Sequence, residues 1–550
     1  MGEIRRLKTK ILITVLALET LAFAGCGAGK PIAPAATSHA LPLRATTSAA
    51  GAGSAALVGE VERELNAMRV THSAAHREHE TANRGLNPPP PGAHANHKKT
   101  QQNLSRTAHS YRMAGQSTAW VSTARMLRRA GFGVTGPEVD AVAGRDWPGY
   151  VDAMLATDPD TDQGAAATPM PAFDAPRPPG KSATPAVRKQ YNQQATEQLG
   201  VLSDWWIRRM VFVREPVHEK LTLLWHNHFA TSAQKVRVAA YMAAQNQKLR
   251  AGSLGDFRAL AYSMLTDAAM LRWLDAPRST AKAPNENLAR EFMELFALGH
   301  GNGYTESDVR NGARALTGWV VGPRGQTSMT PKRHDASAKT LFGQSRNFDA
   351  AGFCDTVLAQ PKSAGYVAGR LWQQLASENP PSPEVLDRLV AAYGPSRDLR
   401  ALTRAILTDS EFTSSRAAVV STPAEWLVGV IRALRVPVDD PKRLKMIDAT
   451  LRTLGQRPFY PPSVGGWPSG QLWLSTASAG TRLRAATELA HAGDLSGIED
   501  TAAGDRVDAV GYLIGVGSWS DRTVKALQPL VRQPAQLVAA AVNTPEYLTS

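Results

Sequence analysis

Two histidines separated by one residue, His226 and His228, are of a residue type and at a spacing that could bind a metal ion. Neighbouring imidazoles supply nitrogen ligands for a divalent transition metal. The two rings converge on a strand or turn, whereas on a regular helix they diverge by about 200°. We predict both histidines as metal ligands. The alternative is that they and Asn227 cap a helix and bond to buried carbonyl groups.

A second set of reactive side chains lies on a predicted helix centred on Phe292. A rotation of about 100° per residue places Glu291 and Glu294 along one flank of its apolar face. Two such carboxylates could approach one ion or one proton together. We therefore predict Glu291 as a further metal ligand, and Glu291 and Glu294 as catalytic residues. The alternative is a solvated flank in which Arg290 pairs with Glu286 and Glu294.

Two loops add further candidates. His334 precedes Asp335 in a polar stretch, where a ligand or base would be accessible, so we predict His334 as a catalytic residue. A loop histidine that is merely exposed is the alternative. The aromatic, Pro/Gly-rich turn at 458–468 either lines a pocket or covers the helices as packed structure. We also predict that the histidine block lies against the glutamate-bearing helix in one polar pocket, because buried polar groups need partners.

The elements that must position these side chains are helices. Past residue 115, apolar residues recur at helical spacing, for example over 199–210, and long alternating strands are absent. A Pro/Gly-rich break at about 157–185 is expected to be a surface loop. The stretch from 319 to 341 favours a small β-hairpin insert. The sequence therefore predicts a mainly α, multi-helix globular body over residues 116–550.

Residues 1–26 have the pattern of an export signal. Basic residues precede an apolar run over 11–23, which is short for a bilayer span but typical of a signal peptide. Ala24 and Gly25 before Cys26 resemble a bacterial lipoprotein processing site. We predict Cys26 as the lipidated residue, with the membrane as a partner and an extracytoplasmic location at the cell membrane or surface. The alternative is an ordinary signal peptide with an incidental cysteine.

The next segment, residues 27–115, is rich in Ala, Ser, Thr, Pro and Gly, and is predicted to be a disordered tether. Half of the net charge of +14 comes from the N-terminal residues, including this segment. Residues 1–115 hold 14 Lys and Arg against 7 Asp and Glu, which leaves +7 for the other 435 residues. That excess is spread thinly and lacks basic runs with interleaved aromatic residues. No nucleic-acid partner is expected.

Several sequence blocks, in order, resemble the bacterial exported family called domain of unknown function 1800. The resemblance runs from about residue 117 to the C-terminus. It implies an exported bacterial protein, often encoded beside an exported partner family resembling sulfatases, and no established activity. The blocks are MLRRAGFG at 126–133, LWHNHFATS at 224–232, PNENLARE at 284–291, YTESDV at 304–309, ARALTGW at 313–319, HD at 334–335 and the turn from 458 to 467.

Two classes of function follow from these residues. The first is a metal-assisted, hydrolytic envelope enzyme, in which a bound divalent ion polarises a substrate oxygen or lowers the pKa of bound water. The second is a noncatalytic surface binding or assembly protein, in which the same polar blocks lock helices together and tryptophans form a recognition surface. No GxSxG nucleophile elbow occurs, which disfavours a serine hydrolase.

Overall fold

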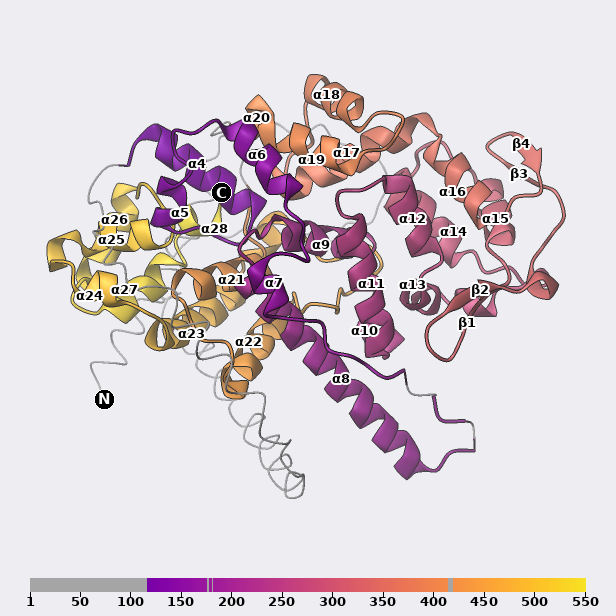
Figure 1. The fold of residues 1–550 in the computed structure, drawn as a ribbon, viewed down its shortest axis with the longest axis horizontal. Helices are drawn as coiled ribbons and strands as arrows, with labels where there is room; N and C mark the ends of the chain where they lie inside the picture. Colours follow the sequence, from indigo (N-terminus) through magenta and orange to yellow (C-terminus); the bar gives the residue numbers. More distant parts are fainter. Residues whose placement is uncertain (1–115, 176–177, 181, 414–418) are drawn as a thin grey trace, which may run out of the picture. The chain divides into compact units, whose positions relative to one another are not determined.

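The computed structural model describes residues 116–175, 178–180, 182–413 and 419–550, and this part of the chain is mainly α-helical (Figure 1). The predicted fold class is therefore confirmed. The predicted signal peptide with Cys26 and the predicted tether over 27–115 lie outside the described residues.

The described helices alternate with short connections along the chain. The first half contains α4 Thr118–Ala130, α5 Gly136–Asp140, α6 Trp147–Ala156, α7 Gln163–Ala166, α8 Pro185–Phe212, α9 Val217–His228, α10 Ala233–Val236, α11 Ala239–Gly252, α12 Phe257–Leu265, α13 Ala268–Trp273, α14 Asn287–Glu291 and α15 Glu306–Ala315. The second half contains α16 Ala350–Leu358, α17 Pro361–Leu375, α18 Pro383–Tyr393, α19 Leu399–Thr408, α20 Ser410–Thr413, α21 Pro423–Ala433, α22 Pro441–Thr453, α23 Thr476–Ala492, α24 Ser496–Glu499, α25 Arg506–Leu513, α26 Asp521–Leu527, α27 Pro534–Ala541 and α28 Pro545–Leu548.

Short helices of other types join these elements. One is a π-helix, η2 Phe292–Ala297, which follows α14 directly. The others are 3-10 helices: η1 Ala276–Arg278, η3 Pro331–Arg333, η4 Gly470–Trp473, η5 Ala503–Asp505 and η6 Gln528–Leu530.

The predicted hairpin insert forms, and a second hairpin follows it. Strand β1 Trp319–Val321 pairs antiparallel with β2 Thr327–Met329. Strand β3 Lys339–Leu341 pairs antiparallel with β4 Gln344–Arg346. Both sheets have two strands, so they form an insert between α15 and α16 and leave the helical body to carry the core.

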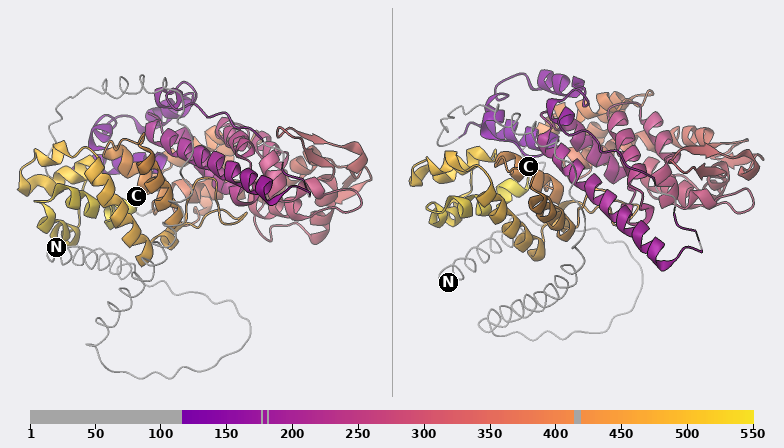
Figure 2. Two further views of the ribbon diagram at one scale, coloured as in Figure 1. Left: turned by 90° about the horizontal axis from the view of Figure 1, so that it is seen from below. Right: turned by 60° about the horizontal axis from the view of Figure 1, so that its bottom comes forward.

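Local sequence explains where the long helix α8 begins. Thr184 accepts a hydrogen bond from Val187 N, and Pro185 follows at the first helical position of α8. The predicted loop before α8 also contains the short α7. The first part of α8 is largely exposed and projects beyond its neighbours, which Figure 2 shows from two further sides. Burial becomes continuous near Leu199, where the apolar helical pattern begins.

The core consists of two clusters of buried apolar side chains, and α9 contributes to both. Leu223 of α9 joins the cluster that contains Trp206 and the C-terminal helices. Leu221 and Leu224 join the cluster formed largely by α12 to α19. Every residue of α9 except Asn227 is buried. Because no face of α9 reaches solvent freely, its polar side chains must find partners inside the protein.

The beginning of the helical body meets its end. Figure 1 places the C-terminus beside α4, and Arg128 of α4 donates hydrogen bonds to the carbonyl oxygens of Glu546, Tyr547 and Thr549. An antiparallel bridge pairs Val420 with Thr549. These long-range contacts bring α4, the segment before α21 and the last residues into one region.

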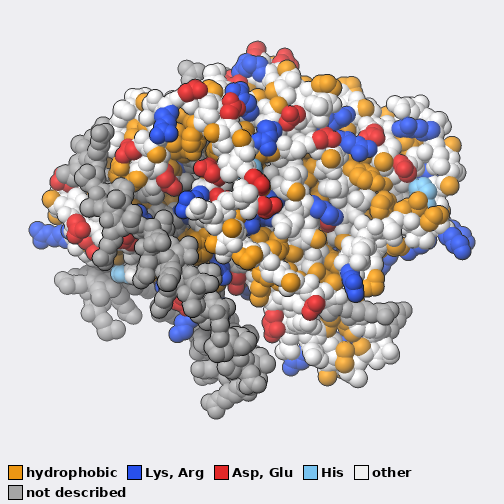
Figure 3. Space-filling view, viewed as in Figure 1, with side chains coloured by type: hydrophobic (Ala, Val, Ile, Leu, Met, Phe, Trp, Pro, Cys, Tyr) orange, Lys and Arg blue, Asp and Glu red, His pale blue; other side chains and the backbone are white. Residues whose placement is uncertain are grey.

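The surface has no dominant charge on the face drawn in Figure 3, where basic and acidic side chains are interspersed. Among the described residues, no helix has the length and apolar character needed to cross a bilayer.

Candidate functional site

The two predicted metal-ligand histidines occupy the last turn of α9, and their rings lie in different surroundings. The ring centroid of His226 lies 5.5 Å from Trp206, 5.5 Å from Phe459 and 5.4 Å from Trp467. His228 instead has its Nε2 atom 2.9 Å from the carbonyl oxygen of Phe296. The helix separates the two rings, as the i, i+2 spacing requires on a regular helix.

Both histidines are neutral at physiological pH. Burial lowers the pKa of His226 to about 3. Burial, together with the charge of Arg370, also lowers the pKa of His228 to about 3, although the hydrogen bond to Phe296 opposes the shift. Neither ring nitrogen of His226 has a hydrogen-bond partner among the described residues. His226 therefore behaves as an aromatic core side chain, whereas His228 ties α9 to the π-helix.

The predicted set of metal ligands is not brought together. In the parts of the chain that the structure describes, no group of three or more His, Cys, Asp and Glu side chains could hold a metal ion, so His226, His228 and Glu291 do not form one. The histidine block does lie against the segment that carries the glutamates. That contact is made by the main chain of Phe296, not by a carboxylate.

The glutamate segment also departs from a regular helix. The sequence predicts one helix through Phe292, but α14 ends at Glu291 and a π-helix follows. Leu298 N donates to the carbonyl of Met293, five residues earlier, across 2.9 Å. The angular positions expected at 100° per residue therefore do not hold beyond Glu291.

Glu294 is held in an ion-pair network. Its carboxylate lies 3.4 Å from Arg290 Nη1 and 3.3 Å from His300 Nδ1. Arg290 also contacts Glu286 at 3.0 Å and Glu306 at 2.7 Å. Glu294 therefore forms the ion pair with Arg290 that the alternative of a solvated helix flank predicts. Arg290 also forms an ion pair with Glu306 of α15.

Glu291 is the carboxylate in this segment best suited to exchange a proton. It is half-buried, and burial followed by the negative charge of Glu294 raises its pKa. Arg290 lowers the pKa but does not offset these effects. No ion pair or hydrogen bond to the Glu291 carboxylate is found among the described residues. A carboxyl group with a raised pKa is favoured for general acid–base chemistry.

His334 is tied to the end of α15 by hydrogen bonds. Its Nδ1 atom lies 3.0 Å from the carbonyl oxygen of Thr317. Asp335 next to it forms a 2.7 Å ion pair with Arg314. Burial alone would raise the pKa of Asp335, but Arg314 and Ser337 hold it well below its usual range. These contacts fasten the hairpin insert to the helical body.

Asn227 joins three segments that are far apart in the sequence. Its Oδ1 atom accepts a 2.7 Å hydrogen bond from Trp467 N, and its Nδ2 atom donates to Gln374 Oε1 across 3.2 Å. Gly466 has a φ of 87°, and a Cβ atom there would collide with the Asn227 carboxamide. The turn at 458–468 therefore packs over α9 as a structural cover.

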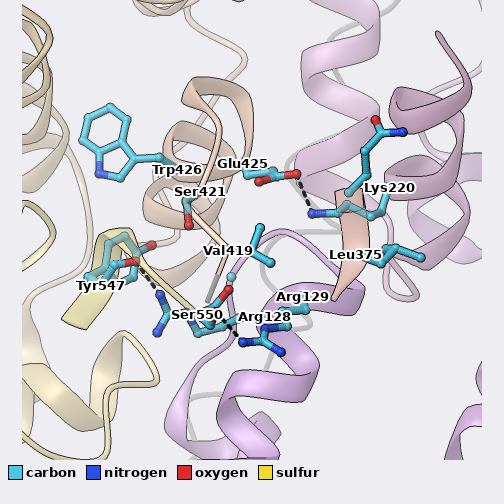
Figure 4. A pocket seen from close by; sticks show the side chains of 12 residues that line it. Arg128, Arg129, Lys220, Leu375, Val419, Ser421, Glu425, Trp426, Tyr547 and Ser550 are labelled. Carbon is cyan, nitrogen blue, oxygen red and sulfur yellow. Dashed lines mark hydrogen bonds and ion pairs between the residues drawn. The ribbon is translucent and has the colours of Figure 1, made fainter. Parts of the chain in front are cut away.

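A pocket near the C-terminus lies outside the predicted site (Figure 4). Arg128 and Arg129 of α4 and Lys220 of α9 line it. Glu425 of α21 forms an ion pair with Lys220, with its Oε1 atom 2.5 Å from Lys220 Nζ. Arg128 and Arg129 lie in the 126–133 block, but residue spacing alone gives no sign that they meet Lys220.

The arginines in this pocket are held in place by main-chain oxygens. Arg129 donates to the oxygens of Phe412 and Ser550, at 2.9 and 2.6 Å. Burial, together with the charges of Arg125 and Arg128, lowers the pKa of Arg129 to about 9. Burial also lowers the pKa of Arg128 to about 10, against an opposing effect of Tyr547. Both guanidinium groups remain charged at neutral pH.

Comparison with known proteins identifies the family. The model of the family described as "Protein of unknown function (DUF1800)" matches residues 125–549. The comparisons with curated proteins and with solved structures gave no match. The matched range contains α9, the π-helix, the hairpin insert and most of the residues that line the pocket. The chain therefore belongs to the DUF1800 family of proteins of unknown function.

Proposed function

We propose that this chain is an exported bacterial protein, held at the cell envelope through a lipid on Cys26, whose helical body is a noncatalytic binding or assembly module. The observation that carries the second half of this proposal is the role of α9. Its polar side chains form contacts that hold helices together. In a metal-assisted enzyme, these side chains would instead have to point toward one shared ion.

The same observation extends across the sequence blocks. Asn227 bonds to the 458–468 turn, His228 bonds to the π-helix, and Asp335 bonds to α15. Each of these polar groups is engaged by an atom of another segment, so each stabilises the packing of the body. The resemblance noted above supports an exported partner protein for such a module.

The first half of the proposal rests on residues 1–26. The basic start, the short apolar run and the small residues before Cys26 are the requirements of lipoprotein processing. Acyl chains on Cys26 would supply the anchoring energy, about 0.8 kcal/mol for each buried CH₂ group.

Replacing Cys26 with alanine tests the anchor. We expect the wild-type chain in the membrane fraction and C26A largely released or left unprocessed, because alanine cannot be acylated. Cell fractionation with immunodetection measures the distribution. Cys354→Ala is the matched control, since Cys354 is buried within the body, and it should fractionate as wild type. Equal partition of wild type and C26A would rule out the lipid anchor.

A further inference from the structure

Asp204 of α8 is a half-buried carboxylate without a partner. In the part of the chain that the structure describes, it forms neither an ion pair nor a hydrogen bond. Arg208 lies one turn further along the same face of α8, where a helix pair with Asp204 would be expected. Its guanidinium group instead pairs at 2.8 Å with Asp439, which lies just before α22. The arginine on this face of α8 is therefore engaged by another carboxylate.

The helix packed against α8 at this position adds a second acidic side chain. α22 packs against α8 (Figure 1), and Asp448 of α22 is close enough for its negative charge to act on Asp204. The Asp448 side chain is 13% exposed and already has two cations, Arg457 at 2.5 Å and Arg452 at 2.8 Å. The contact between α8 and α22 therefore brings two carboxylates near each other, and only one of them is neutralised.

This arrangement disfavours the ionised form of Asp204. Burial, followed by the negative charge of Asp448, raises the pKa of Asp204 from 3.8 to about 6, although Arg457 and Arg208 oppose the shift. Burial also raises the pKa of Tyr460, another titratable group near Asp448, so Tyr460 stays neutral at these pH values. A raised carboxyl pKa contributes stability below the unfolded value of about 4, and this stability is lost as the pH rises to about 6.

The position is also joined to the turn that covers α9. Arg457 directly precedes the turn at 458–468, and its charge acts on Asp204 as well as on α22. Phe459 of the turn packs on Trp206 of α8, with the ring centroids 4.8 Å apart. A change of charge at Asp204 therefore acts on the residues that begin this turn.

We propose that Asp204 makes the contact between α8 and α22 sensitive to pH. Its neutral carboxyl group lets α22 and the start of the 458–468 turn pack closely against α8, and its anion loosens this contact. This regulation of the fold goes beyond the proposed binding role and does not depend on the lipid anchor.

Asp204→Asn imitates the neutral carboxyl group at every pH. Urea unfolding of the full chain, followed by circular dichroism, compares it with wild type. At pH 7.5 we expect the folding equilibrium constant of the variant to be about tenfold larger, since two pKa units set a limit of about a hundredfold and solvent screening reduces it. The advantage should shrink as the pH falls from about 6 toward about 4. Because both chains keep His226 and His228, protonation of these histidines cancels in the comparison.

Glu197→Gln is the matched control. Glu197 lies on the exposed part of α8 and makes no contact through its carboxylate among the described residues, so its removal changes the net charge alike. This variant should follow the wild-type profile. An Asp204→Asn chain no more stable than wild type at pH 7.5, or an advantage that persists at pH 4, would overturn the proposal.

Hydrogen exchange at pH 7.5, measured by mass spectrometry, locates the effect. Amide groups in residues 441–460, which include α22 and the start of the turn, should exchange more slowly in Asp204→Asn than in wild type. The same amides should exchange at the wild-type rate in Glu197→Gln. Equal exchange of residues 441–460 in Asp204→Asn and wild type would also overturn the proposal.

Discussion

Replacing Glu219 with glutamine should destabilise the helical body by about 3–5 kcal/mol, because it removes the buried carboxylate that two buried guanidinium groups share, and only Arg209 keeps a second carboxylate, Asp160 at 3.7 Å. Glu219 is 1% exposed, and its Oε1 atom lies 2.6 Å from Nε of both Arg209 and Arg250. Its Oε2 atom accepts from Trp206 Nε1 at 2.8 Å. Burial alone raises the pKa of Glu219, yet Arg250 and Arg209 lower it to about 2, so the carboxylate is ionised in the folded protein.

Urea unfolding monitored by circular dichroism measures this effect. Asp355→Asn is the matched control, since it removes a carboxylate from the exposed pair with Arg258, where the side chains are 35% and 50% accessible. An exposed pair contributes only about 0–1 kcal/mol. A loss of less than about 1 kcal/mol for Glu219→Gln would show that the buried network does not hold α8, α9 and α11 together.

Acidification from neutral pH should destabilise the body through His226 and His228. Both have a folded pKa of about 3, below the ordinary value of 6.5. A group whose pKa is lower in the folded state contributes stability above its unfolded pKa, and that stability is lost as the pH falls toward the folded pKa. At about pH 4.5, two units below the unfolded value, each histidine should cost about 2–3 kcal/mol.

His226→Phe separates this effect from carboxylate protonation. Phenylalanine suits a site formed by Trp206, Phe459 and Trp467, and it cannot gain a proton. We expect the variant to match wild type at pH 7.5 and to retain more stability near pH 4.5. His491→Gln, at an exposed position, should follow the wild-type profile. Parallel pH profiles for wild type and His226→Phe would contradict a buried neutral imidazole.

The helical architecture could be predicted because apolar periodicity reports burial directly. The pattern that begins at Leu199 coincides with the buried part of α8, and the stretch after Trp319 forms the expected hairpin. The π-helix after Glu291 could not be predicted in this way. A rotation of 100° per residue assumes a regular helix, and the one-residue shift in hydrogen bonding changes the direction of every later side chain.

The candidate site was harder to predict because residue type does not reveal environment. His226 and His228 have the composition of a metal site, but α9 lies between two apolar clusters and directs the rings apart. The sequence suggests a structural alternative for His228, whose partner proves to be a main-chain oxygen. The pocket joins Arg128 to Lys220 and Glu425 through tertiary contacts that no local spacing encodes.

Metal analysis of the chain, purified without a histidine tag, tests most directly whether the α9 histidines are structural. Inductively coupled plasma mass spectrometry should find no transition metal at one equivalent per chain, and His226→Phe and His228→Phe should leave the metal content unchanged. One equivalent of zinc or another divalent metal in the wild-type chain, lost in either variant, would contradict a structural role for the two histidines. That result would favour the hypothesis of a metal-assisted enzyme.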